Sequence, residues 1–544
     1  MLRIMPRPVL VLIVAAAAMA PLISCTSEGT RGPAPVRTPS GTPTPPSAVP
    51  GLVARMSVRE KVGQLFVPTF QTQAQAVAMI KRYHVGGFIY FPVNTRAPRQ
   101  TAQLSNALQK TAKVPLLISV DEEQGLVTRL PYITHFPGNM ALGATRSPGD
   151  VRAAARVTGA ELRAVGINQD FSPVADVNVD PANPVIGTRS FGSDPDLAAR
   201  LVGSAVDGFR DAGVAATAKH FPGHGDTSTD SHTGLPVIRH TRGEWEKVDA
   251  PPFRAAIAHH VDSIMSAHIV VRGLDDSGDP ATLSPKVLTG VLRGDLGYQG
   301  VIITDSLQMA GVRRKYGDRG APVRAIKAGA DQLLMPPSLP KAYDAVLDAV
   351  QAGSIPKRRL DDAVTRVLRL KEQRGLFAGT AADPAAADAV IGSAQHRATA
   401  RQVAEHSITL VKNEGRLLPL RAKSVYVTGT DAPSVAGALR RQGVRVVGTA
   451  RSADVAVLTT RNTGAATAAR VRALGTKPVI VAALGLPYDL RHAGGAKAAL
   501  ATYSAGSASV TALARVLTGS ARPTGKLPVA IPKTYGFGHG LTYP

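Results

Sequence analysis

Residues 219–232 concentrate side chains that can transfer protons and bind polar ligands. The segment reads Lys-His-Phe-Pro-Gly-His-Gly-Asp-Thr-Ser-Thr-Asp-Ser-His, so it holds one lysine, three histidines and two aspartates. Titratable groups gathered this densely usually mark a functional site. Asp230 and His232 are two residues apart, so the carboxylate can hold one imidazole nitrogen while the other donates and accepts a proton. The segment is therefore expected to carry acid–base chemistry.

The elements that must position this segment are those of a parallel α/β fold. Between residues 51 and 378, apolar runs of strand length alternate with helical stretches such as 196–212 and 341–352. Strands are expected at 87–91, 115–120, 167–170, 214–218, 263–267, 301–304 and 332–335. About seven buried strands in about 300 residues fit a (β/α)8 TIM-type barrel or a close variant.

Polar side chains follow several of the expected strands. They are Asp121, Lys219, His220, His268 and Asp305, with Arg189 on a longer loop after 167–170. A barrel brings the C-terminal ends of its strands to one face. These side chains are therefore expected to meet in a single site.

Five segments together resemble glycoside hydrolase family 3, in its β-N-acetylglucosaminidase branch. Besides 219–232 they are D-E-E-Q-G-L-V-T-R (121–129), D-F-S-P-V-A-D-V-N (170–178), V-I-G-T-R-S-F-G (185–192) and G-V-I-I-T-D-S-L-Q-M (300–309). Segments 407–413, 525–528 and 536–543 resemble the second domain of multi-domain members. Glu122, Gln124 and Leu126 depart from the family pattern, which commonly has glutamine, glycine and arginine there.

The resemblance implies roles for single residues. Asp305 would be the nucleophile of a retaining glycosidase, forming a covalent glycosyl intermediate. His232, oriented by Asp230, would be the acid/base. The sugar in the −1 position would be bound by Asp121, Arg129, Arg189, Lys219 and His220. His224 and Asp226 are expected to brace the loop. Taken without the resemblance, Asp305 fits equally well as an N-cap of a helix that starts after it.

The implied activity is that of a retaining exo-β-N-acetylglucosaminidase acting on wall-derived muropeptides or related glycans, with no metal or organic cofactor. A neutral imidazole acid/base would not repel an anion, so phosphate could compete with water. A β-glucosidase or β-xylosidase and a non-catalytic glycan-binding lipoprotein are the alternatives. The spacing of His220 and His224 would suit zinc only on a helix, which Pro222 and Gly223 disfavour.

The N-terminus resembles a bacterial lipoprotein signal peptide, residues 1–24. Arg3 and Arg7 precede an apolar run at 9–20, and Leu-Ile-Ser leads to Cys25, which would carry the lipid. Residues 25–50 are rich in proline, threonine, serine and glycine and are expected to form an extended tether. The protein is therefore expected outside the cytoplasm of a bacterium, anchored to the membrane at Cys25.

A chain of 544 residues exceeds one ordinary core, so two domains are expected. The catalytic barrel is assigned to 51–378, an Ala/Asp/Pro-rich linker to 379–395 and a smaller three-layer α/β sandwich domain to 396–544. Strands of this sandwich are expected at 424–428, 444–447, 455–458 and 479–483.

The formal charge of +24 raises the question of whether the chain binds nucleic acid or another polyanion. The excess comes from scattered arginines, and aromatic residues make up only 4% of the chain. Such a pattern does not favour nucleic acid, which needs basic runs and aromatic stacking. Anionic lipids and wall polymers are the expected surroundings, and the oligomeric state stays open.

Overall fold

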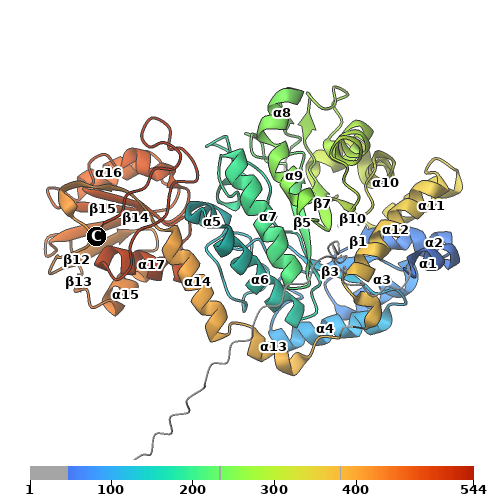
Figure 1. Ribbon diagram of the computed structural model, residues 1–544, viewed down its shortest axis with the longest axis horizontal. Helices are drawn as coiled ribbons and strands as arrows, with labels where there is room; N and C mark the ends of the chain where they lie inside the picture. The colour runs from blue at the N-terminus through green and yellow to red at the C-terminus, as the bar shows by residue number, and fades with distance from the viewer. Residues whose placement is uncertain (1–46, 232–233, 380, 544) are drawn as a thin grey trace, which may run out of the picture. The chain divides into compact units, whose positions relative to one another are not determined.

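The computed structural model describes residues 47–231, 234–379 and 381–543 (Figure 1). Its helices and strands lie in one compact unit that begins at Ala48. The expected signal peptide, Cys25 and the expected tether up to residue 46 lie outside the described residues. In the described ranges, no helix combines the length and the apolar character needed to cross a bilayer.

Eight short parallel strands form the barrel. Six pair side by side in the order β2 (Gly87–Ile89), β3 (Leu117–Val120), β4 (Gln169–Asp170), β5 (Ala215–Phe221), β7 (Ser263–Ser266) and β9 (Val301–Thr304). The other two, β1 (Phe66–Val67) and β10 (Leu333–Leu334), pair with each other. Backbone hydrogen bonds of 3.1 Å, from Gly86 N to Phe66 O and from Thr304 N to Gln332 O, join this pair to both edges of the sheet. The expected (β/α)8 barrel is therefore confirmed.

Seven of the eight strands overlap the predicted runs, and β1 is the one that the sequence did not indicate. It comprises only Phe66 and Val67, directly after a helix, and two residues are too few to show an alternating or continuous apolar pattern. β1 pairs with β10, which is more than 260 residues later in the chain, and this pairing forms only when the strands close into a barrel.

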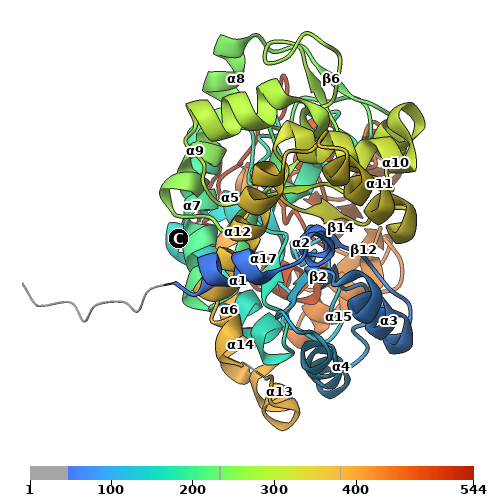
Figure 2. The ribbon, with the colours of Figure 1, turned by 90° about the vertical axis from the view of Figure 1, so that its right-hand side faces the viewer.

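Helices connect the strands and cover the outside of the barrel. Figure 2 shows α3, α4, α10 and α11 around the strands. Several helices begin with proline in the first turn, and Ser147 and Asp194 cap α6 and α7 through side-chain bonds from Asp150 N and Leu197 N. The helices are α1 (Val49–Arg55), α2 (Val58–Gln64), α3 (Gln73–Tyr83), α4 (Pro98–Thr111), α5 (Asn139–Thr145), α6 (Pro148–Ala164), α7 (Pro195–Asp211), α8 (Arg242–Val248), α9 (Ala250–Ala258), the π-helix η3 (Lys286–Asp295), α10 (Ala310–Ala328), α11 (Leu339–Gln351) and α12 (Lys357–Gln373). A small pair of strands, β6 (Val237–Ile238) and β8 (Val270–Val271), lies outside the ring.

The segment expected to be a linker contains helix α13 (Pro384–Val390). The Asp383 side chain accepts hydrogen bonds from the N–H groups of Ala385 and Ala386, and Pro384 occupies the first turn. Ala387 is buried in the barrel's hydrophobic core, and Asp388 forms an ion pair with Arg99 of α4. An Asp-Pro start followed by alanines favours a helix, which composition alone did not reveal.

The C-terminal domain is a six-stranded sheet between two layers of helices. The strand order is β11 (Thr409–Asn413), β16 (Ala498–Ala501), β15 (Val479–Ala483), β14 (Val455–Thr460), β12 (Val425–Gly429) and β13 (Val446–Val447). Only β11 runs antiparallel to its neighbour. One face packs against α14 (Ala394–Ser407), α15 (Ala432–Arg441) and α17 (Ser507–Thr518), and the other against α16 (Ala466–Ala473) and the 3-10 helix η6 (Pro487–His492). The expected three-layer domain is confirmed, and β11 and β16 are strands that the sequence did not indicate.

Candidate active site

A cavity of about 430 Å³ lies at the C-terminal ends of the barrel strands. Its lining includes six residues that the sequence assigned to catalysis or sugar binding: Asp121, Arg129, Arg189, Lys219, His220 and Asp305. They come from the ends of β3, β5 and β9, from the loop after β3, and from η1 (Gly187–Arg189), a 3-10 turn on the loop between β4 and α7. Met265 of β7 also lines the cavity. The closure of the barrel brings these side chains together.

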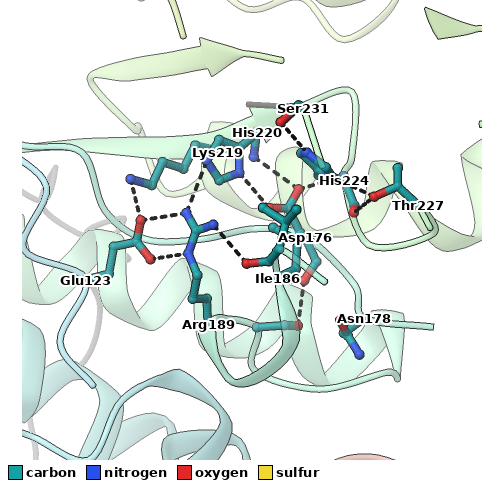
Figure 3. Close-up of polar contacts among 12 residues, drawn as sticks. Glu123, Asp176, Asn178, Ile186, Arg189, Lys219, His220, His224, Thr227 and Ser231 are labelled. Carbon is teal, nitrogen blue, oxygen red and sulfur yellow. Dashed lines mark hydrogen bonds and ion pairs between the residues drawn. The ribbon is translucent and has the colours of Figure 1, made fainter. Parts of the chain in front are cut away.

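Glu123 is the centre of an ion-pair network at the cavity wall (Figure 3). Its carboxylate accepts from Arg189 Nε at 2.7 Å and from Arg189 Nη2 at 2.8 Å, and it lies 2.6 Å from Lys219 Nζ. Lys219 Nζ also donates to Asp121 Oδ1 at 2.7 Å. Glu123 was not predicted as a site residue, although it lies in the segment D-E-E-Q-G-L-V-T-R. The signal that could have found it is the run of three acidic residues, 121–123, directly after a strand end.

The network keeps its members charged. Burial by itself would raise the pKa of Glu123, but Arg189 and Lys219 outweigh burial and hold that pKa below its usual value. Burial would lower the pKa of Lys219, and the carboxylates of Asp121 and Glu123 raise it instead. Two cations and two carboxylates thus form a balanced array of fixed donors and acceptors, which suits a polyhydroxylated ligand.

Asp176 orients His220. Its Oδ2 lies 2.7 Å from His220 Nδ1, and its Oδ1 accepts from the backbone N–H of His220 at 3.1 Å and of His224 at 2.8 Å. Because the Asp176 carboxylate accepts a hydrogen bond, Nδ1 of His220 carries a proton. The other ring nitrogen of His220, Nε2, lies 3.4 Å from Arg189 Nη2. Asp176 is fully buried and was not predicted as a site residue, although it belongs to the quoted segment 170–178.

Asp305 follows β9 and is held as a carboxylate. Its Oδ1 accepts from Ser306 N at 2.6 Å. Burial would raise its pKa, but His220, His268, the Ser306 N–H and Lys219 together lower the pKa below its usual value. His268 is itself fully buried, with its ring nitrogens 3.0 Å from Thr282 Oγ1 and from Ser306 O. His268 therefore helps to lower the pKa of Asp305 from a buried position outside the cavity lining.

The alternative use of Asp305 as a helix N-cap is wrong. The next helix, α10, begins at Ala310, and its N-cap is Met309. Ser306 and Gln308, between Asp305 and the helix, line the cavity. The Asp305 carboxylate is therefore available for chemistry rather than needed to begin a helix.

Arg129 and Glu122 occupy the loop after β3. Glu122 Oε2 accepts from Arg129 N at 2.7 Å and from Leu130 N at 3.1 Å, so it shapes the loop. The Arg129 guanidinium lies over the Phe91 ring at 5.5 Å. Its Nε is buried without a hydrogen-bond partner among the described residues, and the residue lines the cavity.

His224 and Asp226 brace the loop after β5, as expected. The His224 ring bonds Thr227 Oγ1 at 2.9 Å and Ser231 Oγ at 2.8 Å (Figure 3). Burial lowers the pKa of His224 to about 4, so the ring is neutral and serves the loop structurally. Asp226 pairs with His240 at 2.9 Å.

His232 lies outside the described residues, so its role as acid/base stays a prediction. The described part of the loop ends at Ser231, which lines the cavity and directly precedes His232 in sequence. Asp230 is described and takes part in polar interactions. Within the described parts of the chain, no group of three His, Cys, Asp or Glu side chains is arranged to hold a metal ion.

Two family models match the chain. Residues 57–370 match the Glycosyl hydrolase family 3 N terminal domain, and residues 408–543 match the Glycosyl hydrolase family 3 C-terminal domain. The first match alone covers more than half of the chain.

Known proteins similar to this chain carry hexosaminidase names. Beta-hexosaminidase A of Pseudoalteromonas piscicida is 38% identical over 379 residues, which cover 64% of this chain and 63% of that protein. Beta-hexosaminidase LpqI of Mycobacterium tuberculosis is 37% identical over 67% of this chain and 97% of its own length. A solved family 3 beta-N-acetylglucosaminidase from Paenibacillus sp. str. FPU-7 superposes with a TM-score of 0.81 at 37% identity, covering 88% of this chain and 99% of that one.

Proposed function

This chain belongs to glycosyl hydrolase family 3, and we propose that it is a retaining exo-β-N-acetylglucosaminidase in which Asp305 is the nucleophile. Glycoside hydrolysis of the β-hexosaminidase type follows from the family and from the relatives. The observation that carries the finer proposal is the ionised Asp305 carboxylate at a strand end, facing a cavity that gathers the predicted sugar ligands.

The reaction is a double displacement. Asp305 attacks the anomeric carbon while the acid/base protonates the departing glycosidic oxygen, which yields a glycosyl ester and a free alcohol. Water then attacks the anomeric carbon and gives its proton to the acid/base, which releases the sugar with retained configuration and regenerates the Asp305 carboxylate. His232 is the proposed acid/base, because the His224-braced loop carries the chain to the cavity at Ser231, one residue earlier.

The sugar in the −1 position would be bound by the charged network. Glu123 and Asp121 accept from hydroxyls, and Lys219, Arg189 and Arg129 donate to them. A cavity of about 430 Å³ is at the small end of ligand pockets, which supports binding of one terminal residue and hence exo action.

Terminal β-linked GlcNAc of wall-derived muropeptides is the proposed substrate, and the membrane surface is the proposed location. The location is supported by the sequence around Cys25. Fatty-acid labelling of cells that produce the full chain, beside a Cys25→Ser variant, tests the anchor. Label that stays on the variant would contradict lipidation at Cys25.

Kinetics on nitrophenyl glycosides test the activity. The full chain, solubilised in detergent, is given the β-GlcNAc and β-glucoside substrates, beside Asp305→Ala and the exposed control Asp388→Asn. Turnover of the GlcNAc substrate that is lost in Asp305→Ala and kept in Asp388→Asn supports the proposal. Preference for the glucoside would assign a β-glucosidase instead. Glycan binding without turnover of either substrate would leave a binding protein.

A further inference from the structure

The loop that carries Arg189 has little regular structure of its own. It joins β4 to α7, and within it only η1 is helical. In the part from 178 to 193, called the Arg189 loop below, Asn178 Oδ1 accepts from Gly187 N at 3.0 Å and Asn178 N donates to Gly192 O at 2.9 Å. Such a segment has many accessible conformations, so a fixed Arg189 needs support from outside the loop.

The C-terminal domain contacts the loop beyond Arg189. Pro528 O accepts from Ser193 N at 3.0 Å. Gly192 has a φ of +152°, and a Cβ built there would come within 2.3 Å of Pro528 O. The two backbones therefore meet at a distance that only glycine permits.

The same domain also contacts the loop ahead of Arg189. A Cβ built at Gly187 would lie 3.5 Å from Leu486 Cδ2, so the Leu486 side chain lies against the start of η1. Tyr488 lies next to the Asn178 side chain, which lowers the pKa of its hydroxyl, while burial outweighs this effect and raises the pKa to about 12. Both residues belong to the Gly-Leu-Pro turn and helix η6, which follow β15.

Helix α5 makes a third connection. Asn139 Nδ2 donates to the Arg189 carbonyl at 2.8 Å. Met140, Ala141 and Ala144 of the same helix are buried in a hydrophobic core with β14, β15 and β16. The backbone of α5 is bonded to the C-terminal domain as well, through Lys526 N to Ala144 O at 2.9 Å. The helix that holds the Arg189 backbone is thus part of the second domain's packing.

The cavity itself has no lining residue from this domain among the residues that the structure describes. Its lining runs from Phe91 to Met335. Any influence of the C-terminal domain on the reaction must therefore pass through residues that it holds. Val185 and Arg189 are the cavity residues of the loop that it contacts on both sides, and of these two Arg189 carries the charge.

We propose that the C-terminal domain is a positioning element for Arg189. Leu486, Tyr488 and Pro528 hold the Arg189 loop so that the guanidinium stays paired with Glu123 and presents its remaining donors to the sugar. The part of this inference that concerns sugar binding rests on the proposed function. The positioning of Arg189 rests on the contacts alone. Because Arg189 would bind the hydroxyls in both the ground state and the transition state, loosening the loop should raise KM more than it lowers kcat.

The test combines kinetics with a cycle of variants in the full chain. Leu486→Ala and Tyr488→Phe, singly and together, are compared with Leu420→Ala and Val444→Ala. These two controls alter partly buried residues that pack against the other hydrophobic core of the same domain. We expect the loop variants to raise KM about tenfold with kcat changed by less than about threefold, and the controls to change neither. In an Arg189→Ala background the loop variants should cause no further loss. Losses that multiply in that background would overturn the proposal.

Hydrogen exchange of the amides at 178–193 gives a readout that needs no substrate. Faster exchange in Leu486→Ala and Tyr488→Phe than in the two controls supports positioning, and unchanged exchange overturns it. If the wild type turns over neither nitrophenyl glycoside, the proposed function fails, while the exchange experiment still decides whether the domain holds the loop.

Discussion

Arg189 and Glu123 form a bidentate pair, with Arg189 Nε 2.7 Å from Glu123 Oε2 and Arg189 Nη2 2.8 Å from Glu123 Oε1. The Glu123 side chain is 1% exposed and that of Arg189 12%. The pair joins the strand end of β3 to the loop that the C-terminal domain supports. It therefore links the wall of the cavity to the loop that the C-terminal domain contacts.

Removing the Glu123 charge should destabilise the protein and impair sugar binding. Glu123→Gln leaves Arg189 and Lys219 buried with reduced compensation, which typically costs about 3–5 kcal/mol of unfolding free energy when one partner is lost. Urea unfolding and KM measure the two effects. Glu414→Gln, whose carboxylate is half exposed, is the control and should leave the unfolding free energy nearly unchanged. Equal stability of the two variants would contradict the prediction.

Glu122 should make stability fall as pH rises. Burial raises its pKa to about 8 from 4.5, against hydrogen bonds from Arg129 N and Leu130 N that lower it. Between pH 4.5 and about pH 8 the folded state holds a proton on Glu122 that the unfolded state has lost. The contribution of Glu122 to the unfolding free energy therefore declines by up to about 1.4 kcal/mol per pH unit.

Glu122→Gln should remove that contribution while it keeps the shape of the loop. A protonated carboxyl resembles an amide, and glutamine is common at this position in the family that the sequence resembles. We expect a flatter dependence of unfolding free energy on pH between 5.5 and 7.5, measured by urea unfolding. Identical slopes in wild type and variant would show that Glu122 is already ionised.

Lys371 should have the opposite effect at higher pH. It is fully buried, its Nζ donates to Gln64 Oε1 at 2.6 Å, and burial lowers its pKa to about 7 from 10.5. Above pH 7 the unfolded state binds the extra proton, so the contribution of this group to stability rises with pH up to about 10.5. Lys371→Met should flatten the curve between pH 7.5 and 9. A curve that keeps the wild-type slope would exclude a neutral lysine.

Gly225→Ala should disable the loop that leads to Ser231. A Cβ at this position would lie 1.7 Å from Val177 O, so the backbone must move. A displacement of about 1 Å can lower kcat about a hundredfold. Gly243→Ala in α8 is the control, because nothing lies within 4 Å of a Cβ there. Similar kcat values for the two variants would argue that the loop does not position a catalytic group.

Much of the cavity could be predicted from the sequence. Asp121 and Asp305 directly follow apolar strands, and the ends of parallel strands meet at one face of a barrel. Charged residues that line the cavity were therefore identifiable from strand endings together with family motifs. The two-residue strand β1 could not be identified in this way, because two residues are too few to show a periodic pattern.

The sequence by itself determined which reactive side chains are present and the order of the strands that position these side chains. Both can be read from local patterns of a few residues. The tertiary structure alone decided the pairing of Glu123 with Arg189, 66 residues away, and of Asp176 with His220, 44 residues away. It also decided that Leu486 and Pro528 of the second domain support the Arg189 loop. Such contacts arise from packing between distant segments, for which a local pattern of apolar and polar residues contains no information.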